Sequence, residues 1–172
     1  MIQTRQIGAA ALLTAMIGVS GSAWGVEPIS IGVFTDWTAY TYKASDTKVC
    51  YVVSRPKSSD AVKKVKRDPI FFIITHMPGR NINGEVSTII GYPFKEATTV
   101  QLKIDNVEFE LFTNGDGAWA DTTEKEKKIV ATMKAGQQFS VTGMSWKGTE
   151  TTDHYSLNGF TAAMDMIDSS CK

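Results

Sequence analysis

The stretch that decides the fold is Val100-Gln-Leu-Lys-Ile-Asp-Asn-Val-Glu-Phe-Glu-Leu111. Apolar and polar residues alternate on both sides of Asp105-Asn106, a pair that tolerates the positive φ of a two-residue turn. A turn of that length places Ile104 opposite Val107 and brings all the apolar side chains of the stretch to one face. The stretch therefore predicts an antiparallel hairpin, with Lys103 facing Glu108 on the opposite, solvated side.

Further segments on both sides of this hairpin are also typical of strands. Residues 31–42, 49–54 and 85–91 are rich in β-branched and aromatic residues. The run Ile70–Ile74 is continuously apolar between two prolines, which predicts a central strand buried on both faces. A second hairpin is expected from Gln138 to Tyr155 with Lys147-Gly148 at its tip, and its blurred alternation places it nearer an edge of the sheet.

Two short helices are predicted among the strands. Asp121 is expected to cap the first, with Glu124 completing a capping box and Gly136 ending the helix. The second is expected to begin near Ser156. Its apolar residues recur at steps of three and four along one face, and they are Leu157, Phe160, Met164, Ile167 and Cys171. Short antiparallel strands with two short helices predict a mainly β fold, an immunoglobulin-like antiparallel β-sandwich.

Residues 1–25 have the order of a signal peptide. Arg5 precedes an apolar segment from Ile7 to Val19, and the small residues Ala23 and Gly25 suit a signal peptidase. We therefore predict cleavage after Gly25, which leaves one domain over residues 26–172 and no transmembrane segment. A buried N-terminal helix is the alternative interpretation of this segment.

Export changes the interpretation of the cysteines. Cys50 and Cys171 are the two cysteines in the chain, and an even number in an oxidising compartment predicts one disulfide. Two free buried thiols are the alternative. The cysteines and the histidines His76 and His154 lack the spacing of a zinc site, so we expect no metal and no cofactor.

The distribution of charged residues predicts a local basic surface, whereas the chain as a whole has no net charge that would attract a charged partner. The chain has 18 Lys and Arg residues against 18 Asp and Glu residues, which argues against a nucleic-acid partner. The segment 55–67 is locally basic, and its cations are Arg55, Lys57, Lys63, Lys64, Lys66 and Arg67. It can bind an anionic surface such as lipopolysaccharide or an acidic receptor patch, and a solvated charged loop is the alternative.

Aromatic residues near two turns are further candidates for partner contacts. Trp119 lies beside Asn114-Gly-Asp-Gly117, and Trp146 lies beside Lys147-Gly148. Tryptophan is common at the energetic centres of interfaces, although packing within the fold is the alternative role for both. The Asn114–Gly117 segment is interpreted as a tight turn, because Ala118 and Ala120 interrupt the ligand series of a calcium loop.

The motifs of enzymes are not found in the sequence. Gly143-Met-Ser-Trp-Lys-Gly148 has the wrong spacing for a nucleophile elbow, and no Walker A loop or dinucleotide fingerprint is present. Neither His76 nor His154 has a neighbouring carboxylate-and-nucleophile pattern. The sequence therefore predicts a protein that is not an enzyme.

Four segments together resemble the invasion-associated locus B (IalB) family of exported bacterial proteins. They are Lys48-Val-Cys-Tyr-Val-Val-Ser-Arg-Pro56, Glu85-Val-Ser-Thr-Ile-Ile-Gly-Tyr92, Phe109-Glu-Leu-Phe-Thr-Asn-Gly-Asp-Gly-Ala-Trp-Ala120 and Thr151-Thr-Asp-His-Tyr-Ser-Leu-Asn-Gly-Phe-Thr161. The resemblance implies an immunoglobulin-like β-sandwich, a periplasmic or surface location and a link to host-cell invasion in some pathogens. It implies no established catalytic residues.

These observations favour an exported binding protein of the periplasm or outer surface. Its expected partner is an envelope or host-surface protein, a lipid or a glycan. A structural or stress-related envelope protein without a host role is the second hypothesis. The third is an enzyme whose site is assembled by tertiary proximity, which residue spacing does not reveal.

Overall fold

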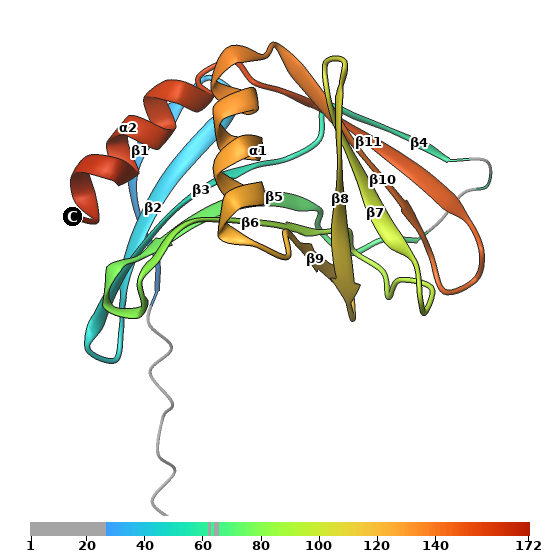
Figure 1. Cartoon of the computed structure of the whole chain (residues 1–172), viewed down its shortest axis with the longest axis horizontal. Coiled ribbons are helices and arrows are strands. Elements are labelled where there is room, and N and C mark those ends of the chain that lie inside the picture. The colour runs from blue at the N-terminus through green and yellow to red at the C-terminus, as the bar shows by residue number, and fades with distance from the viewer. Residues whose placement is uncertain (1–26, 62, 64–65) are drawn as a thin grey trace, which may run out of the picture.

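A computed structural model describes residues 27–61, 63 and 66–172, so the predicted signal peptide lies outside the described residues. The described residues form one sheet in the order β1-β2-β3-β5-β6-β9-β8-β7-β10-β11-β4 (Figure 1). All neighbouring strands are antiparallel. The prediction of a mainly β, antiparallel fold with two helices is confirmed, while the immunoglobulin-like detail stays a prediction. The elements are β1 (Ile29–Phe34), β2 (Trp37–Ala44), β3 (Thr47–Ser54), β4 (Ser58–Ala61), β5 (Phe71–Met77), η1 (Pro78–Arg80), β6 (Ile82–Ile89), β7 (Thr99–Ile104), β8 (Val107–Asn114), β9 (Gly117–Trp119), α1 (Thr123–Ala135), β10 (Gln138–Met144), β11 (Glu150–Ser156) and α2 (Phe160–Ser170).

The hairpin that decides the fold forms in the predicted register. Ile104 lies opposite Val107 and Lys103 lies opposite Glu108, whose charged groups are 3.5 Å apart. Asp105 takes the positive φ of 47° that the two-residue turn needs. The second hairpin also forms, and its strand β11 is covered at the sheet edge by the short strand β4, as its weaker pattern indicated.

The continuous sheet folds back on itself around one core. Trp37 of β2 and Phe72 of β5 contact Phe139 of β10, with ring centroids 6.3 and 4.7 Å apart. Phe139 in turn stacks on Tyr155 of β11 at 4.6 Å. These residues from distant strands belong to a single buried cluster, so the inner faces of the two halves of the sheet share one core.

The outer side of β5 corrects one prediction. Phe72 and Ile74 are fully buried, whereas Phe71 and Ile73 are only partly buried. The run Ile70–Ile74 is therefore not covered on both faces, because both helices pack on the inner side of the sheet. Their buried residues lie in the same cluster as the inward side chains of β2, β3 and β5.

Helix α1 begins one residue later than its predicted cap implies. The backbone N–H of Lys125 donates to the Thr122 hydroxyl at 3.2 Å, so Thr122 is the N-cap in place of Asp121. Asp121 instead forms an ion pair with the Lys125 ammonium at 2.7 Å. The helix ends before Gly136, as predicted.

Helix α2 begins at Phe160 rather than near Ser156, because Ser156 is the last residue of β11. Gly159 precedes the helix with a φ of 88°, and a Cβ at this position would collide with the carbonyl of Phe34. The predicted apolar face of the segment is confirmed, since each of its members is buried.

A disulfide joins Cys50 of β3 to Cys171, directly after α2, as predicted. The bond closes a sequence separation of 121 residues and fixes the end of α2 against the sheet. The Lys48 ammonium adds a hydrogen bond of 2.6 Å to the carbonyl of Ser170. Among the helices of the described part of the chain, none is long and apolar enough to cross a membrane.

Candidate functional site

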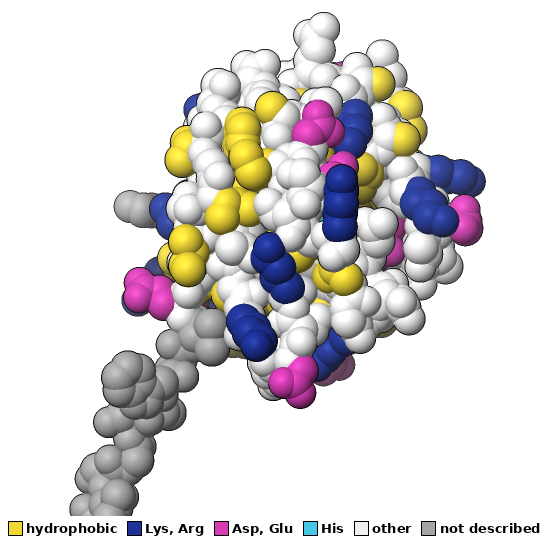
Figure 2. Space-filling view, turned by 90° about the vertical axis from the view of Figure 1, so that its left-hand side faces the viewer, with side chains coloured by type: hydrophobic (Ala, Val, Ile, Leu, Met, Phe, Trp, Pro, Cys, Tyr) yellow, Lys and Arg dark blue, Asp and Glu magenta, His cyan; other side chains and the backbone are white. Residues whose placement is uncertain are grey.

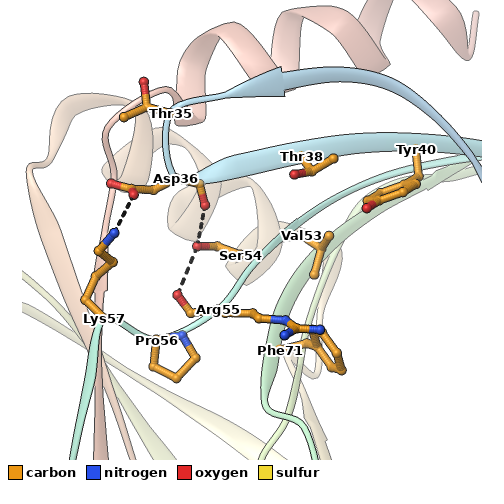
Figure 3. Close-up of a pocket in the computed structure, with 10 residues that line it drawn as sticks. All are labelled: Thr35, Asp36, Thr38, Tyr40, Val53, Ser54, Arg55, Pro56, Lys57 and Phe71. Atoms are coloured by element: carbon orange, nitrogen blue, oxygen red, sulfur yellow. Dashed lines mark hydrogen bonds and ion pairs between the residues drawn. The ribbon is translucent and has the colours of Figure 1, made fainter.

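A pocket of about 540 Å³ opens where the β1–β2 turn, the end of β3 and the start of β5 meet (Figure 3). We call it the Arg55 pocket. Its wall contains cationic side chains, aromatic rings and hydroxyl groups. Its lining residues are Thr35, Asp36, Thr38, Tyr40, Val53, Ser54, Arg55, Pro56, Lys57 and Phe71.

The turn at the rim of the pocket is held in a conformation that its sequence disfavours. Thr35 has a φ of 53°, in the left-handed region that β-branched residues rarely adopt. The next residue fixes the turn from two sides. The N–H of Asp36 donates to the carbonyl of Asn158 at 3.2 Å, and the Asp36 carbonyl accepts from the Ser54 hydroxyl at 2.8 Å. Strain that is held in this way is common where a site is preorganised.

An ion pair closes one side of the pocket. The Lys57 ammonium lies 2.7 Å from the Asp36 carboxylate. The hydrogen bond from Lys57, followed by one from Ser156, holds the pKa of Asp36 below its ordinary value. Asp36 is therefore ionised at neutral pH, and the charge of Lys57 is compensated within the pocket.

Arg55 lies on the opposite side of the pocket and has a different partner. Its guanidinium carbon lies 5.0 Å from the centre of the Phe71 ring, a cation–π contact between the end of β3 and the start of β5 (Figure 3). Within the described residues Arg55 forms no ion pair with a carboxylate. Its charge is thus exposed and held in place, but not neutralised.

The pocket continues into an outer aromatic face, which we define as Tyr40, Tyr42, Tyr51, Val53 and Phe71. Tyr40 stacks on Tyr51 at 5.3 Å, and Tyr42 meets Tyr51 edge-on at 6.2 Å. Burial raises the pKa of Tyr51, and its two phenol neighbours raise it further. All five side chains are partly buried, so each one keeps some contact with solvent.

Trp119, predicted as a partner-contact residue, lies farther along the outer side of the same sheet. It is partly buried and stacks on Phe112 at 5.9 Å, and Phe112 is 47% exposed. A Cβ on Gly117 would collide with the Trp119 ring, so the glycine of the predicted turn makes room for the indole. Both the tight turn and a packing role for Trp119 are therefore present.

The described residues of the segment 55–67 do not form one cationic surface. Lys63 and Lys66 are exposed, whereas Lys64 lies outside the described residues. Lys57 is paired with Asp36. Arg67 points inward, where its guanidinium contacts Asp153 at 2.5 Å. Of these predicted partner-contact residues, the Arg55 pocket brings together Arg55 and Lys57 only.

Trp146 is the most exposed of the tryptophans in the described residues, at 61%. It lies at the β10–β11 turn, and the ammonium of Lys147 lies 4.8 Å from its ring. Hydrophobic side chains also reach the surface on β1, at Ile29 and Val33. Figure 2 shows the side of the molecule that carries β1 and α2, opposite the β10–β11 turn, and there hydrophobic and basic side chains lie close to one another.

The two histidines occupy different environments. His76 is buried, and its Nε2 lies 2.7 Å from Asp168 of α2. His154 is partly exposed, and its Nε2 lies 2.9 Å from Asp60 of β4. In the described ranges no group of three or more His, Cys, Asp or Glu side chains could hold a metal ion.

The arrangement in the Arg55 pocket suits recognition by charge, ring stacking and hydrogen bonding.

Several residues of this site were not identified from the sequence. Tyr51 and Val53 alternate with inward residues along β3, so the period of two carried a signal for an outer apolar row. Phe71 was predicted to lie in a strand buried on both faces, so its contact with Arg55 on the outer side of the sheet was not expected. Thr35 and Asp36 gave no signal, because their role depends on the end of β11 and on Lys57.

One of three comparisons with known proteins finds a match, and it is to a protein family. The family model described as Invasion associated locus B (IalB) protein matches residues 37–168. No curated protein matches the chain. No solved structure matches it either.

Proposed function

Because the chain belongs to the invasion associated locus B (IalB) protein family, we propose that it is an exported binding protein whose partner docks on the outer aromatic face and the Arg55 pocket. The partner is an envelope or host-surface protein, a lipid or a glycan. The observation that carries the proposal is a fixed, partly exposed set of aromatic side chains on the side of the sheet away from both helices.

Export is supported by two independent features. Residues 1–25 have the pattern of a signal peptide. The disulfide between Cys50 and Cys171 suits an oxidising compartment outside the cytosol, where such bonds form and persist. We therefore propose a location in the periplasm or on the outer surface.

The outer aromatic face has the physical character of a recognition surface. Tyr40 and Tyr42 are held by Tyr51, so ordering them against a partner costs little conformational entropy. Phenol rings offer apolar area together with a hydrogen-bonding hydroxyl. The neighbouring Arg55 adds an uncompensated charge at the edge of the face. These groups recognise a ligand without transforming it, so we propose binding rather than catalysis.

A binding experiment tests the surface directly. The protein purified from the envelope is immobilised and exposed to solubilised envelope and to host-cell membranes. Capture should be lost in the double variant Tyr40→Ser, Tyr51→Ser and kept in Trp146→Ser, which removes an exposed aromatic side chain outside the face. Equal capture by all three proteins, or no capture at all, contradicts the proposal.

Location and biological role need separate measurements. The intact mass of the protein shows whether residues 1–25 are removed, and fractionation with a surface-protease test separates the periplasm from the outer surface. A deletion strain that has a permeability defect and normal association with host cells favours the alternative of a structural envelope protein.

A further inference from the structure

The charges in the Arg55 pocket leave a single positive charge unmatched. Lys57 and Asp36 neutralise each other across 2.7 Å, and the lowered pKa of Asp36 keeps that pair ionised. Arg55 is held against Phe71 and has no carboxylate partner among the described residues. One unmatched guanidinium suits a monoanion, and its planar fork of donors matches a carboxylate in a bidentate contact.

The walls beside Arg55 suit a ring with polar edges. Tyr40 and Val53 turn aromatic and apolar surface toward the pocket, and beyond Val53 the Phe71 ring holds the Arg55 guanidinium (Figure 3). Tyr40 is fixed by its stack on Tyr51. The C–H bonds on one face of a pyranose carry slight positive charge, and they pack against the negative face of an aromatic ring.

The rim supplies hydrogen-bonding groups for the ring hydroxyls. Thr35 and Thr38 line the pocket, and a hydroxyl group both donates and accepts. The turn that carries Thr35 is fixed through both backbone polar groups of Asp36. The volume of about 540 Å³ lies within the roughly 300–1,000 Å³ of small-molecule sites, so the pocket is large enough for one sugar ring.

We propose that the Arg55 pocket binds a pyranose ring bearing one carboxylate, such as a hexuronate unit of an acidic glycan. This inference rests on the proposed binding function and names the ligand class of the same site. The carboxylate contacts Arg55, the ring lies against the aromatic wall, and the ring hydroxyls face the threonines. A phosphorylated sugar carries more negative charge than the pocket offsets, so it binds more weakly.

Titration of the ¹⁵N-labelled protein by NMR tests the proposal with glucuronate as the probe. We expect saturable shifts confined to amides around Thr38, Arg55 and Phe71. Glucose tests the ring without the charge, acetate tests the charge without the ring, and glucose 6-phosphate tests the dianion. Each of these three should bind at least tenfold more weakly than glucuronate. Shifts that map elsewhere, or equal affinity for glucose 6-phosphate, overturn the inference.

Variants separate the role of Arg55 from general effects on the fold. Arg55→Gln should weaken glucuronate binding at least tenfold, and Arg55→Lys should weaken it less, because the charge stays and the fork is lost. Arg80→Gln, which removes an exposed arginine of η1 outside the pocket, should bind as the unaltered protein does. The dispersion of the amide spectrum confirms that each variant is folded.

The two proposals fail in different ways. If envelope or host material is captured through Tyr40 and Tyr51 but glucuronate does not bind, the ligand class is wrong and the proposed function stands. If glucuronate binds through Arg55 but no partner is captured, the small-ligand site stands and the docking of a larger partner is wrong.

Discussion

Arg67 and Asp153 form a bidentate ion pair inside the molecule. Arg67 Nη1 donates to Asp153 Oδ1 at 2.7 Å, and Nη2 donates to Oδ2 at 2.5 Å. The Asp153 side chain is fully buried, and that of Arg67 is 10% exposed. Arg67 Nε also donates to the carbonyl of Ile90 at 2.9 Å, and the Ser59 hydroxyl donates to Asp153. The pair therefore ties the segment before β5 to β11 and β4.

Removing one partner of this pair should be costly. Asp153→Ala leaves a guanidinium buried without its counter-charge, and we expect the free energy of unfolding to fall by about 3–5 kcal/mol in urea titrations. Glu108→Ala is the matched control, because it breaks a surface pair with Lys103 at 3.5 Å. That change should cost less than about 1 kcal/mol. Similar losses in the two variants would show that the buried pair has no special role.

Tyr155→Phe should leave the protein as stable as before or raise its stability. The Tyr155 ring stacks on Phe139, but its buried hydroxyl makes no protein hydrogen bond of good geometry among the described residues. Burial raises the pKa of Tyr155 far above its ordinary value. The nearby Thr88 side chain lowers the pKa of Tyr155 only slightly, because the Thr88 hydroxyl donates to the carbonyl of Phe71 at 3.0 Å. Removing an unsatisfied polar group should increase the free energy of unfolding by up to about 1 kcal/mol.

Tyr92→Phe provides the opposite case for the same chemical change. The Tyr92 hydroxyl donates to the carbonyl of Gly143 at 3.1 Å and lies 2.7 Å from the Thr151 hydroxyl. Its loss should lower the free energy of unfolding by about 1–2 kcal/mol. A larger loss for Tyr155→Phe than for Tyr92→Phe is the outcome that contradicts this prediction.

Glu126→Gln should stabilise the protein at neutral pH. Burial, and then repulsion from Glu85, raises the pKa of Glu126 above its ordinary value, despite its place in the first turn of α1. The pKa of Glu126 is higher in the folded protein than in the unfolded chain. The folded state therefore loses stability as the pH rises from the pKa of the unfolded chain through that of the folded protein, because the carboxyl ionises less readily in the fold. The gain should be a few tenths of a kcal/mol at pH 7 and should disappear below about pH 4.

Glu124→Gln is the control for this helix. Glu124 is exposed in the same first turn and pairs with Lys127 at 3.6 Å. Its charge favours the positive end of the helix dipole, so its removal should slightly lower the melting temperature. A stabilising effect of Glu126→Gln that persists at pH 3.5 would rule out the ionisation of Glu126 as its cause.

Loss of the disulfide should be the largest change in stability. For a separation of 121 residues, chain-entropy reasoning gives about 5 kcal/mol. Cys50→Ala with Cys171→Ala should unfold at a much lower urea concentration than the oxidised protein. Reducing agent should lower the stability of the unaltered protein to that of the double variant, and it should leave the double variant unchanged.

Local patterns predicted those parts of the fold that local interactions determine. The turn at Asp105 and the alternation on both sides of it specify the β7–β8 register, since neighbours in sequence become partners across the hairpin. The apolar face of α2 was likewise visible at helical spacing. Its start was not, because the helical spacing begins at Leu157, whereas Ser156 still pairs with Gln138 at the end of the hairpin and Gly159, with a φ of 88°, separates the strand from the helix.

The Arg55 pocket shows what local patterns cannot supply. Arg55 was a candidate because of its charge, but its role depends on Phe71, which pairing between β3 and β5 brings close. Arg67 carried the same charge signal and lies instead against Asp153 of β11. The two arginines differ only in which distant strand lies next to them, and periodicity along the chain does not contain that information.

The covalent link between Cys50 and Cys171 also determines how the protein responds to proteolysis. A single cut anywhere between these residues divides the chain into two pieces that remain one molecule, because each piece keeps one of the joined sulfurs. A nicked protein would migrate as a single species on a non-reducing gel and separate into two after reduction. A cut before Cys50 would instead free an N-terminal fragment from the covalent link, and a cut after Cys171 would free Lys172.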